Sequence, residues 1–268
     1  MSQSETPPNN HPSPHTAFKT LPIVNISGLF SEDKESRQAA ANALDKAARE
    51  AGFLYLTGHG VSDESIEALK RSAKTFFAQT EAFKSSVYIG NSVNHSGYVP
   101  MGEEQFYGSS KIDAKESGFE LTDLTHQRPM LGPNQWPELA NFREGVQGYY
   151  EQVLALSKKL FSGFSLALGL EEDYFAPYLK APANQLRLIH YFHNSEQQED
   201  RPGIGAHTDY EFFTILLPTS PGLQVLNGAG EWIDAPIVPG AFVVNIGDMM
   251  EILSNGEYVA TSHRVKKV

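Results

Sequence analysis

The 268-residue sequence contains no cysteine. A chain without thiols can form neither a disulfide framework nor a thiolate metal site. Any bound metal must therefore be held by nitrogen and oxygen donors, which the 9 His and the 32 Asp and Glu residues can supply. A chain without cysteine is compatible with a reducing compartment, and we expect a cytoplasmic protein.

Positive charge is also scarce, with 21 Lys and Arg residues against 32 Asp and Glu residues and a formal net charge of -11. Such a balance disfavours binding to phosphate backbones and anionic lipid, so we expect no nucleic-acid partner and no membrane partner. No run reaches the roughly 18 to 20 apolar residues that span a bilayer. Residues 1–18 lack the basic and apolar segments of a secretory signal, and their composition predicts a flexible leader.

Hydrophobic residues make up 40% of the sequence and aromatic residues 11%, which is enough for a packed core. Residues 21–30 and 53–61 have strand signals, and residues 35–51 have a helical apolar face. Ser62 is a good N-cap for a second helix. A polar stretch without sustained period follows from Ser85, so we expect an N-terminal α/β region with a long loop over residues 19–130.

The second half of the chain has a different pattern. Residues 142–168 form the longest helical pattern, and short strand signals separated by Pro and Gly follow Gln185. Several short strands at this spacing are typical of a sandwich or barrel. We therefore predict a mainly β fold with helical support and a double-stranded β-helix (jelly roll) core. Residues 131–268 would hold the long helix and this catalytic core.

Three side chains in the β-rich half could converge on one metal ion. His207 and Asp209 are two residues apart, so in an extended segment they point to the same side. His263 lies in a distant strand signal that a jelly roll can bring beside them. Two His and one carboxylate leave three octahedral positions open, as in non-haem iron(II) oxygenases, whereas a structural zinc site would be closed. The alternative is two ordinary buried histidines and a turn aspartate.

Several longer blocks match one family in order and spacing. They are LRLIHYF, GIGAHTDYEFFTILL, PGLQVLNGAGEWIDAP, PGAFVVNIGDMMEILSNGEY and SHRVKKV. Together they resemble the isopenicillin N synthase-like branch of the 2-oxoglutarate- and iron(II)-dependent dioxygenases. LPIVNISGLF and AGFLYLTGHGV look like that family's opening domain. The resemblance covers nearly the whole chain after the leader.

The resemblance implies that His207, Asp209 and His263 are the Fe(II) ligands. It also implies that Tyr191 lies near the bound 2-oxoglutarate, although a core tyrosine is an equal alternative. Arg187 could orient the site or form a surface ion pair. Two family positions match turn and structural elements, Asn245 and Asp248.

The implied function is an oxygenase that uses Fe(II), 2-oxoglutarate and O2 to oxidise a small organic molecule, giving succinate and CO2. Hydroxylation is the default outcome. A 2-oxoglutarate-independent iron oxidase of the same family and a catalytically inactive jelly-roll binding protein are the alternatives. GIGAHTDY also looks like the ethylene-forming bacterial relatives.

Three aromatic residues and a turn histidine are further candidates for the site. Tyr98, Phe212 and Phe213 could form walls of a substrate pocket, although core packing is the stronger interpretation for each. His59, between two glycines, is better explained as a turn histidine with satisfied hydrogen bonds.

One departure from the family pattern concerns the residues that bind the cosubstrate carboxylate. The family carries an Arg-x-Ser pair about one strand beyond its distal histidine, and this sequence ends at Val268. Because side chains alternate along a strand, Arg264 and Lys266 should face away from the site. Lys267 should face the same side as His263, but it lies near an end of the chain that is expected to fray. Either the sequence is a fragment that lacks the last strand of the jelly roll, which we expect, or it is a full chain with an impaired oxygenase site.

Overall fold

The computed structural model describes residues 16–94, 96–100, 109–114, 133–180, 184–191 and 204–266, with the backbone alone for 109–114. Most of the predicted leader and the predicted boundary at residue 130 lie outside these ranges. No helix in the described ranges is long and apolar enough to cross a membrane.

The described strands form two four-stranded sheets and one three-stranded sheet. The first sheet has the order β1 (Ile23–Asn25), β2 (Phe53–Thr57), β10 (Phe242–Ile246) and β7 (Phe213–Leu216). The second has the order β6 (Ile204–His207), β11 (His263–Val265), β8 (Leu223–Leu226) and β9 (Trp232–Asp234). The third contains β3 (Gly97–Val99), β4 (Ser109–Ala114) and β5 (Leu186–Tyr191). This is the predicted jelly-roll architecture, and the sheets are not closed among the described strands.

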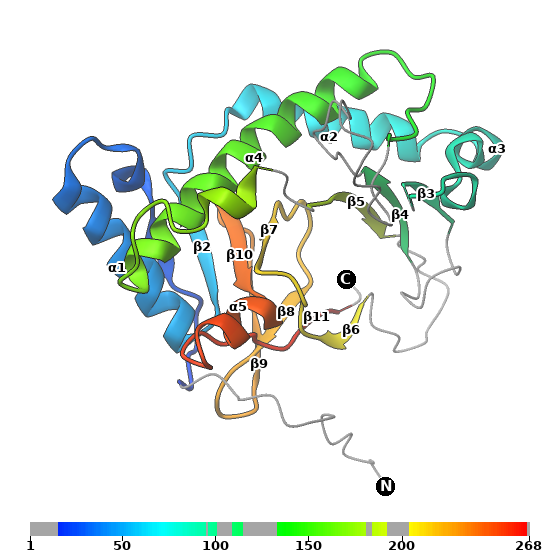
Figure 1. The fold of residues 1–268 in the computed structure, drawn as a ribbon. Coiled ribbons are helices and arrows are strands. Elements are labelled where there is room, and N and C mark those ends of the chain that lie inside the picture. Colours follow the sequence, from blue (N-terminus) through cyan, green and yellow to red (C-terminus); the bar gives the residue numbers. More distant parts are fainter. Residues whose placement is uncertain are drawn as a thin grey trace, which may run out of the picture.

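A layer of helices covers one face of the first sheet (Figure 1). It contains α1 (Lys34–Glu50), α2 (Asp63–Phe77) and α4 (Phe142–Ala167), and the shorter helices are α3 (Glu81–Lys84) and α5 (Asp248–Leu253). The side chains of Asp33 and Ser62 cap α1 and α2, and each accepts a hydrogen bond from a backbone N–H of the first turn. The helical support expected from the sequence is confirmed.

Strand β10 separates two hydrophobic cores. Phe242, Val244 and Ile246 pack toward the helices, whereas Val243 packs in the second core between the two larger sheets. Every β10 residue is buried, because both faces of the strand are covered. Asn245 points to the same side as Val243, so one polar side chain is directed into the space between the sheets.

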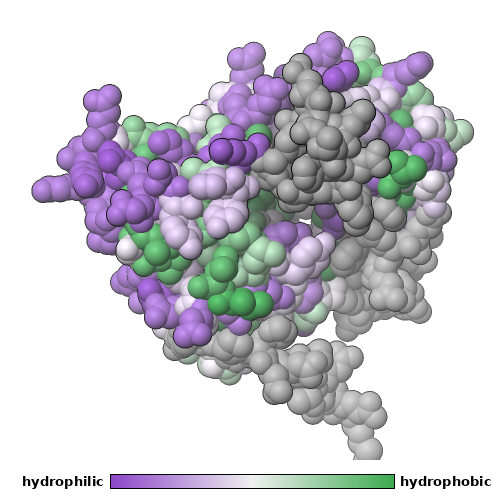
Figure 2. Space-filling view, viewed as in Figure 1, coloured by the Kyte–Doolittle hydropathy of each residue, from purple (hydrophilic) through white to green (hydrophobic). Residues whose placement is uncertain are grey.

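The surface differs between two helices of the face that Figure 2 shows. The outward side of α1 is hydrophilic, whereas apolar surface gathers over α5. The exposed large apolar side chains of α5 are Met249, Ile252 and Leu253.

Some elements differ from their sequence-based expectation. The signal at residues 21–30 yields the three-residue strand β1 and then a 3-10 turn, Ser27–Phe30. The stretch after Ser85, expected to be a long loop, contains β3 and β4. The terminal signal forms a strand only at His263–Val265. Strand β6 and helix α5 were not predicted. The strands among these elements are short and α5 has only 6 residues, which leaves little local period to detect.

Candidate metal centre

The site begins with two histidines on neighbouring strands of the second sheet. His207 ends β6 and pairs in antiparallel register with His263, the first residue of β11. Directly opposed residues share a face of the sheet, and the two imidazole centroids lie 4.3 Å apart. His263 also pairs with Val225 of the core between the sheets, and its ring contacts Phe53 edge-on at 5.1 Å. Both rings therefore project into the space between the sheets.

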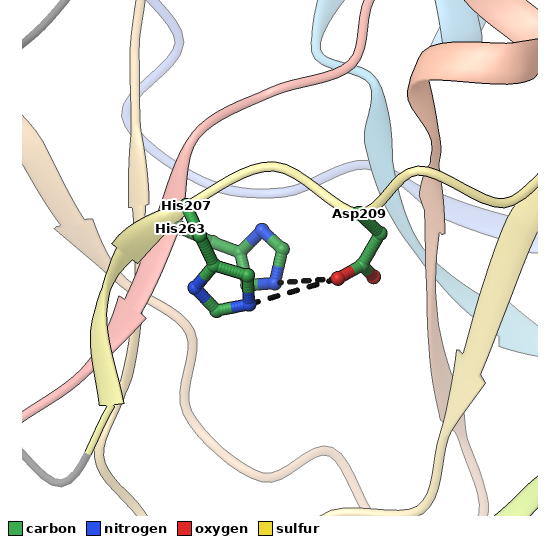
Figure 3. Close-up of side chains that lie close together, drawn as sticks. All are labelled: His207, Asp209 and His263. Atoms are coloured by element: carbon green, nitrogen blue, oxygen red, sulfur yellow. Dashed lines mark ion pairs between the residues drawn. The ribbon is translucent and has the colours of Figure 1, made fainter. Parts of the chain in front are cut away.

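Asp209 completes the group two residues after His207. Its Oδ1 lies 3.6 Å from Nε2 of His207 and 3.7 Å from Nε2 of His263, so both rings converge on one carboxylate oxygen (Figure 3). The three ligand atoms all lie within 4.8 Å of one another. Among the described residues, these are the only three His, Asp or Glu side chains grouped closely enough to hold one metal ion. The structure thus brings the three predicted residues together.

The outer nitrogen of each imidazole is bonded to a backbone carbonyl. Nδ1 of His207 lies 2.8 Å from the carbonyl oxygen of Gly205, and Nδ1 of His263 lies 3.2 Å from that of Thr261. A carbonyl oxygen can only accept, so Nδ1 carries the proton in each neutral ring. The lone pair is then on Nε2, the atom that faces Asp209.

The second oxygen of Asp209 accepts two hydrogen bonds from side chains of the first sheet. Oδ2 accepts hydrogen bonds from the hydroxyl of Thr214 at 2.6 Å and from the side-chain amide of Asn245 at 2.7 Å. Burial raises the pKa of Asp209, but His263, these two hydrogen bonds and His207 outweigh it and lower the pKa below its ordinary value. Asp209 is therefore ionised, with Oδ1 left to face the histidines.

These donors fit a divalent cation. Burial lowers the pKa of His263, and this effect outweighs the opposing attraction of Asp209, so the neutral ring is favoured. The lone pair on Nε2 of His263 and the ionised Oδ1 of Asp209 thus face each other, and Nε2 of His207 lies beside them. Both nitrogen–oxygen separations are shorter than two metal–ligand bonds of about 2 Å each, so an ion can bridge Oδ1 of Asp209 and either ring.

The backbone of Asp209 is held by the turn between β10 and α5. The backbone N–H of Asp248 donates to the carbonyl of Asp209 at 2.7 Å, and that of Gly247 donates to the carbonyl of Phe212 at 3.0 Å. A Cβ added to Gly247 would lie 2.0 Å from the carbonyl oxygen of Glu211. The close approach of the two segments therefore requires glycine at position 247.

Comparison with known families identifies this architecture. The family model described as 2OG-Fe(II) oxygenase superfamily matches residues 183–268, and the model described as non-haem dioxygenase in morphine synthesis N-terminal matches residues 21–139. The homoarginine-6-hydroxylase 2-ODD-C23.1 of Arabidopsis thaliana is 36% identical over 269 residues, which cover 93% of this chain and 81% of the relative. The chain belongs to the 2OG-Fe(II) oxygenase superfamily. It is a 2-oxoglutarate-dependent dioxygenase that uses Fe(II), as the sequence predicted.

Solved structures agree with this family assignment. A 2OG-Fe(II) oxygenase family protein from Caulobacter crescentus is 29% identical with a TM-score of 0.78, and the match covers 92% of this chain and 80% of that chain. A full-length Neurospora crassa protein solved in complex with alpha-KG and thymine has a TM-score of 0.81 at 23% identity. That match covers 96% of this chain and 82% of the other, and it supports the fold alone.

The other candidates for the oxygenase site lie elsewhere or stay predictions. Tyr191 ends β5 and is partly buried, and burial raises its pKa to about 12, so it is a neutral phenol. Its place beside 2-oxoglutarate stays a prediction. Arg187 is exposed on the same strand. Nδ1 of His59 accepts from the N–H of Val61 at 3.1 Å and Nε2 lies 3.2 Å from the carbonyl oxygen of Gly240, as expected for a structural turn histidine.

Core packing is confirmed for the three aromatic residues that were candidate pocket walls. Phe212 and Phe213 contact Phe161, with ring centroids 5.3 Å and 4.8 Å away. Tyr98 is 1% exposed, and its hydroxyl bonds to Glu81.

Arg264 and Lys266 face away from the site, as predicted. The guanidinium of Arg264 lies 4.1 Å from the ring centroid of Trp232, and Lys266 bonds to Asp234 at 2.8 Å. Lys267 lies outside the described residues.

Proposed function

We propose that His207, Asp209 and His263 together bind the single Fe(II) of this dioxygenase. The proposal is carried by one observation, the convergence of both Nε2 atoms on Oδ1 of Asp209. Two His and one carboxylate leave three positions of an octahedral ion open, enough for a chelating cosubstrate and O2. Bound Fe(II) would supply the redox chemistry that couples 2-oxoglutarate decarboxylation to substrate oxidation.

The protein's own part is orientation. The Nδ1 hydrogen bonds of the two histidines fix each ring with its lone pair toward the metal position, and Thr214 and Asn245 fix the carboxylate. We further propose that the hydroxyl of Tyr191 donates a hydrogen bond to a carboxylate of 2-oxoglutarate. Its raised pKa supports this role, because the phenol keeps its proton across the working pH range.

For the substrate, we propose a small organic molecule that is hydroxylated, with succinate and CO2 as coproducts. An amino acid with a cationic side chain is the first class to test. Four curated relatives, 33% to 36% identical, are named homoarginine-6-hydroxylases. A net charge of -11 also favours the approach of a cation. Succinate release in the presence of homoarginine, arginine and lysine would rank the candidates.

Two finer predictions also stand as proposals. The matched N-terminal region ahead of the catalytic region supports the isopenicillin N synthase-like branch. A cytoplasmic location rests on composition, and cell fractionation would test it.

Anaerobic titration of the Fe(II)-loaded protein with 2-oxoglutarate tests the proposed function. Chelation produces a weak metal-to-ligand charge-transfer band in the visible, and we expect this band to be absent from His207→Ala. His59→Ala is the matched control, because it removes an imidazole that is bonded outside the three-residue group. Bound iron without a band would refute chelation and favour the oxidase or the binding-protein alternative.

A further inference from the structure

Thr214 and Asn245 form a cross-strand pair that acts on one atom. They are register partners on β7 and β10, so their side chains lie on the same face of the first sheet. Both donate a hydrogen bond to Oδ2 of Asp209, at 2.6 Å and 2.7 Å. The family resemblance assigns neither residue a role at the metal.

The two hydrogen bonds decide which carboxylate oxygen is available. A carboxylate can bind a metal through one oxygen or through both, and the second mode occupies an additional coordination position. With Oδ2 accepting two hydrogen bonds, only Oδ1 faces the histidines. Turning Oδ2 toward the metal would leave the amide of Asn245, which is 3% exposed, without this acceptor inside the protein.

The same segment also fixes the main chain of Asp209. Asn245 lies just before Gly247 and Asp248, whose backbone N–H groups bond to the carbonyls of Phe212 and Asp209. The segment from Asn245 to Asp248 therefore restrains Asp209 at its side chain and at its backbone.

We propose that Thr214 and Asn245 are positioning residues that keep Asp209 a one-oxygen metal ligand and so preserve an open coordination position for 2-oxoglutarate. This inference rests on the proposed function, because it requires Asp209 to bind the metal.

The test uses Co(II), whose visible absorption reports coordination number, and the anaerobic 2-oxoglutarate titration of the Fe(II) protein. Thr214→Val removes the hydroxyl at nearly constant shape. We expect Co(II) affinity to fall by about 10- to 100-fold, the usual effect of losing a partner of a metal ligand. The Co(II) spectrum should also shift, and 2-oxoglutarate should bind more weakly. Thr214→Ser should restore all three properties.

Two controls separate the possible failures. Thr57→Val makes the same change on β2, where the hydroxyl bonds to the carbonyl of Val24, and should leave the Co(II) spectrum unchanged. Asn245→Ala should reproduce the Thr214→Val shift in a variant whose circular dichroism remains native. Wild-type Co(II) affinity, spectrum and 2-oxoglutarate binding in Thr214→Val would overturn the inference. Undiminished Co(II) affinity in His207→Ala would instead refute the proposed function itself.

Discussion

His207 and His263 occupy opposed register positions on β6 and β11, with their imidazole centroids 4.3 Å apart. Each strand supplies one histidine, and Asp209 follows two residues after the end of β6. Strand β11 lies between β6 and β8 in the sheet. An ion that binds both rings would therefore link two strands that are distant in sequence. Metal binding and the stability of the second sheet should be coupled.

This coupling predicts a metal-dependent thermal shift. A metal at roughly 100 times its Kd should stabilise the wild-type fold by about 2.7 kcal/mol, because it binds the native state alone. In His263→Ala the shift should largely disappear. The metal-induced change in Tm, measured by differential scanning fluorimetry with Mn(II), is the quantity to compare, since removing the buried ring lowers stability by itself. An equal shift in the variant would contradict the role of His263.

Tyr191→Phe tests the proposed contact with the cosubstrate. A hydrogen bond to a charged group contributes about 1.5–3 kcal/mol, so the Kd of 2-oxoglutarate should rise about tenfold or more. Mn(II) affinity should stay unchanged. Tyr98→Phe is the matched control because its hydroxyl bonds to Glu81. Unaltered 2-oxoglutarate binding in Tyr191→Phe would favour the core-tyrosine alternative.

Two helix caps predict different pH dependences. Hydrogen bonds from Ser36 are the largest cause that lowers the pKa of Asp33 below its ordinary value of 3.8. A carboxyl with a lowered folded pKa stabilises the protein above its unfolded pKa, and the effect is lost as pH falls through the folded pKa. The stability difference between wild type and Asp33→Ala should therefore be present at neutral pH and shrink below pH 3.8.

Ser62→Ala provides the uncharged control for that prediction. Its hydroxyl accepts from the N–H of Ser65, and losing it should cost about 1 kcal/mol at every pH. Urea unfolding at several pH values measures both variants. A difference for Asp33→Ala that stays constant with pH would show that the carboxylate charge has no part in capping α1.

The parts of the fold predicted from the sequence depend on local signals. The predicted helix at residues 142–168 matches α4 (Phe142–Ala167). A long helix repeats its apolar residues at the helical period over many turns, so the pattern is visible in the sequence itself. His207 and Asp209 could be paired because residues two apart in an extended segment point to the same side. His263 was added through the family resemblance as well as its strand signal.

The rest depends on contacts that no local pattern encodes. Strand β4 pairs with β3 on one side and with β5, far along the sequence, on the other, so the stretch that contains β3 and β4 has no local strand period and resembles a loop. Thr214 and Asn245 meet at Asp209 through the register of β7 against β10. The family resemblance interprets Asn245 as a turn or structural element, and the signal that points beyond this is a polar residue inside the otherwise apolar strand FVVNI.

Gly247→Ala should weaken both the fold and the metal site. The new Cβ would lie 2.0 Å from the carbonyl oxygen of Glu211 and 3.1 Å from that of Asp209, so backbone atoms must move. Overpacking of this kind costs about 1–3 kcal/mol, and the movement should carry Asp209 away from the histidines. Gly148→Ala in α4 is the matched control, because nothing lies within 4 Å of its added Cβ, and it should stabilise the helix by about 0.5–1 kcal/mol. Urea unfolding and Co(II) titration measure the two effects. If Gly247→Ala bound Co(II) like wild type, the β10–α5 turn would be a support of the fold without influence on the position of Asp209.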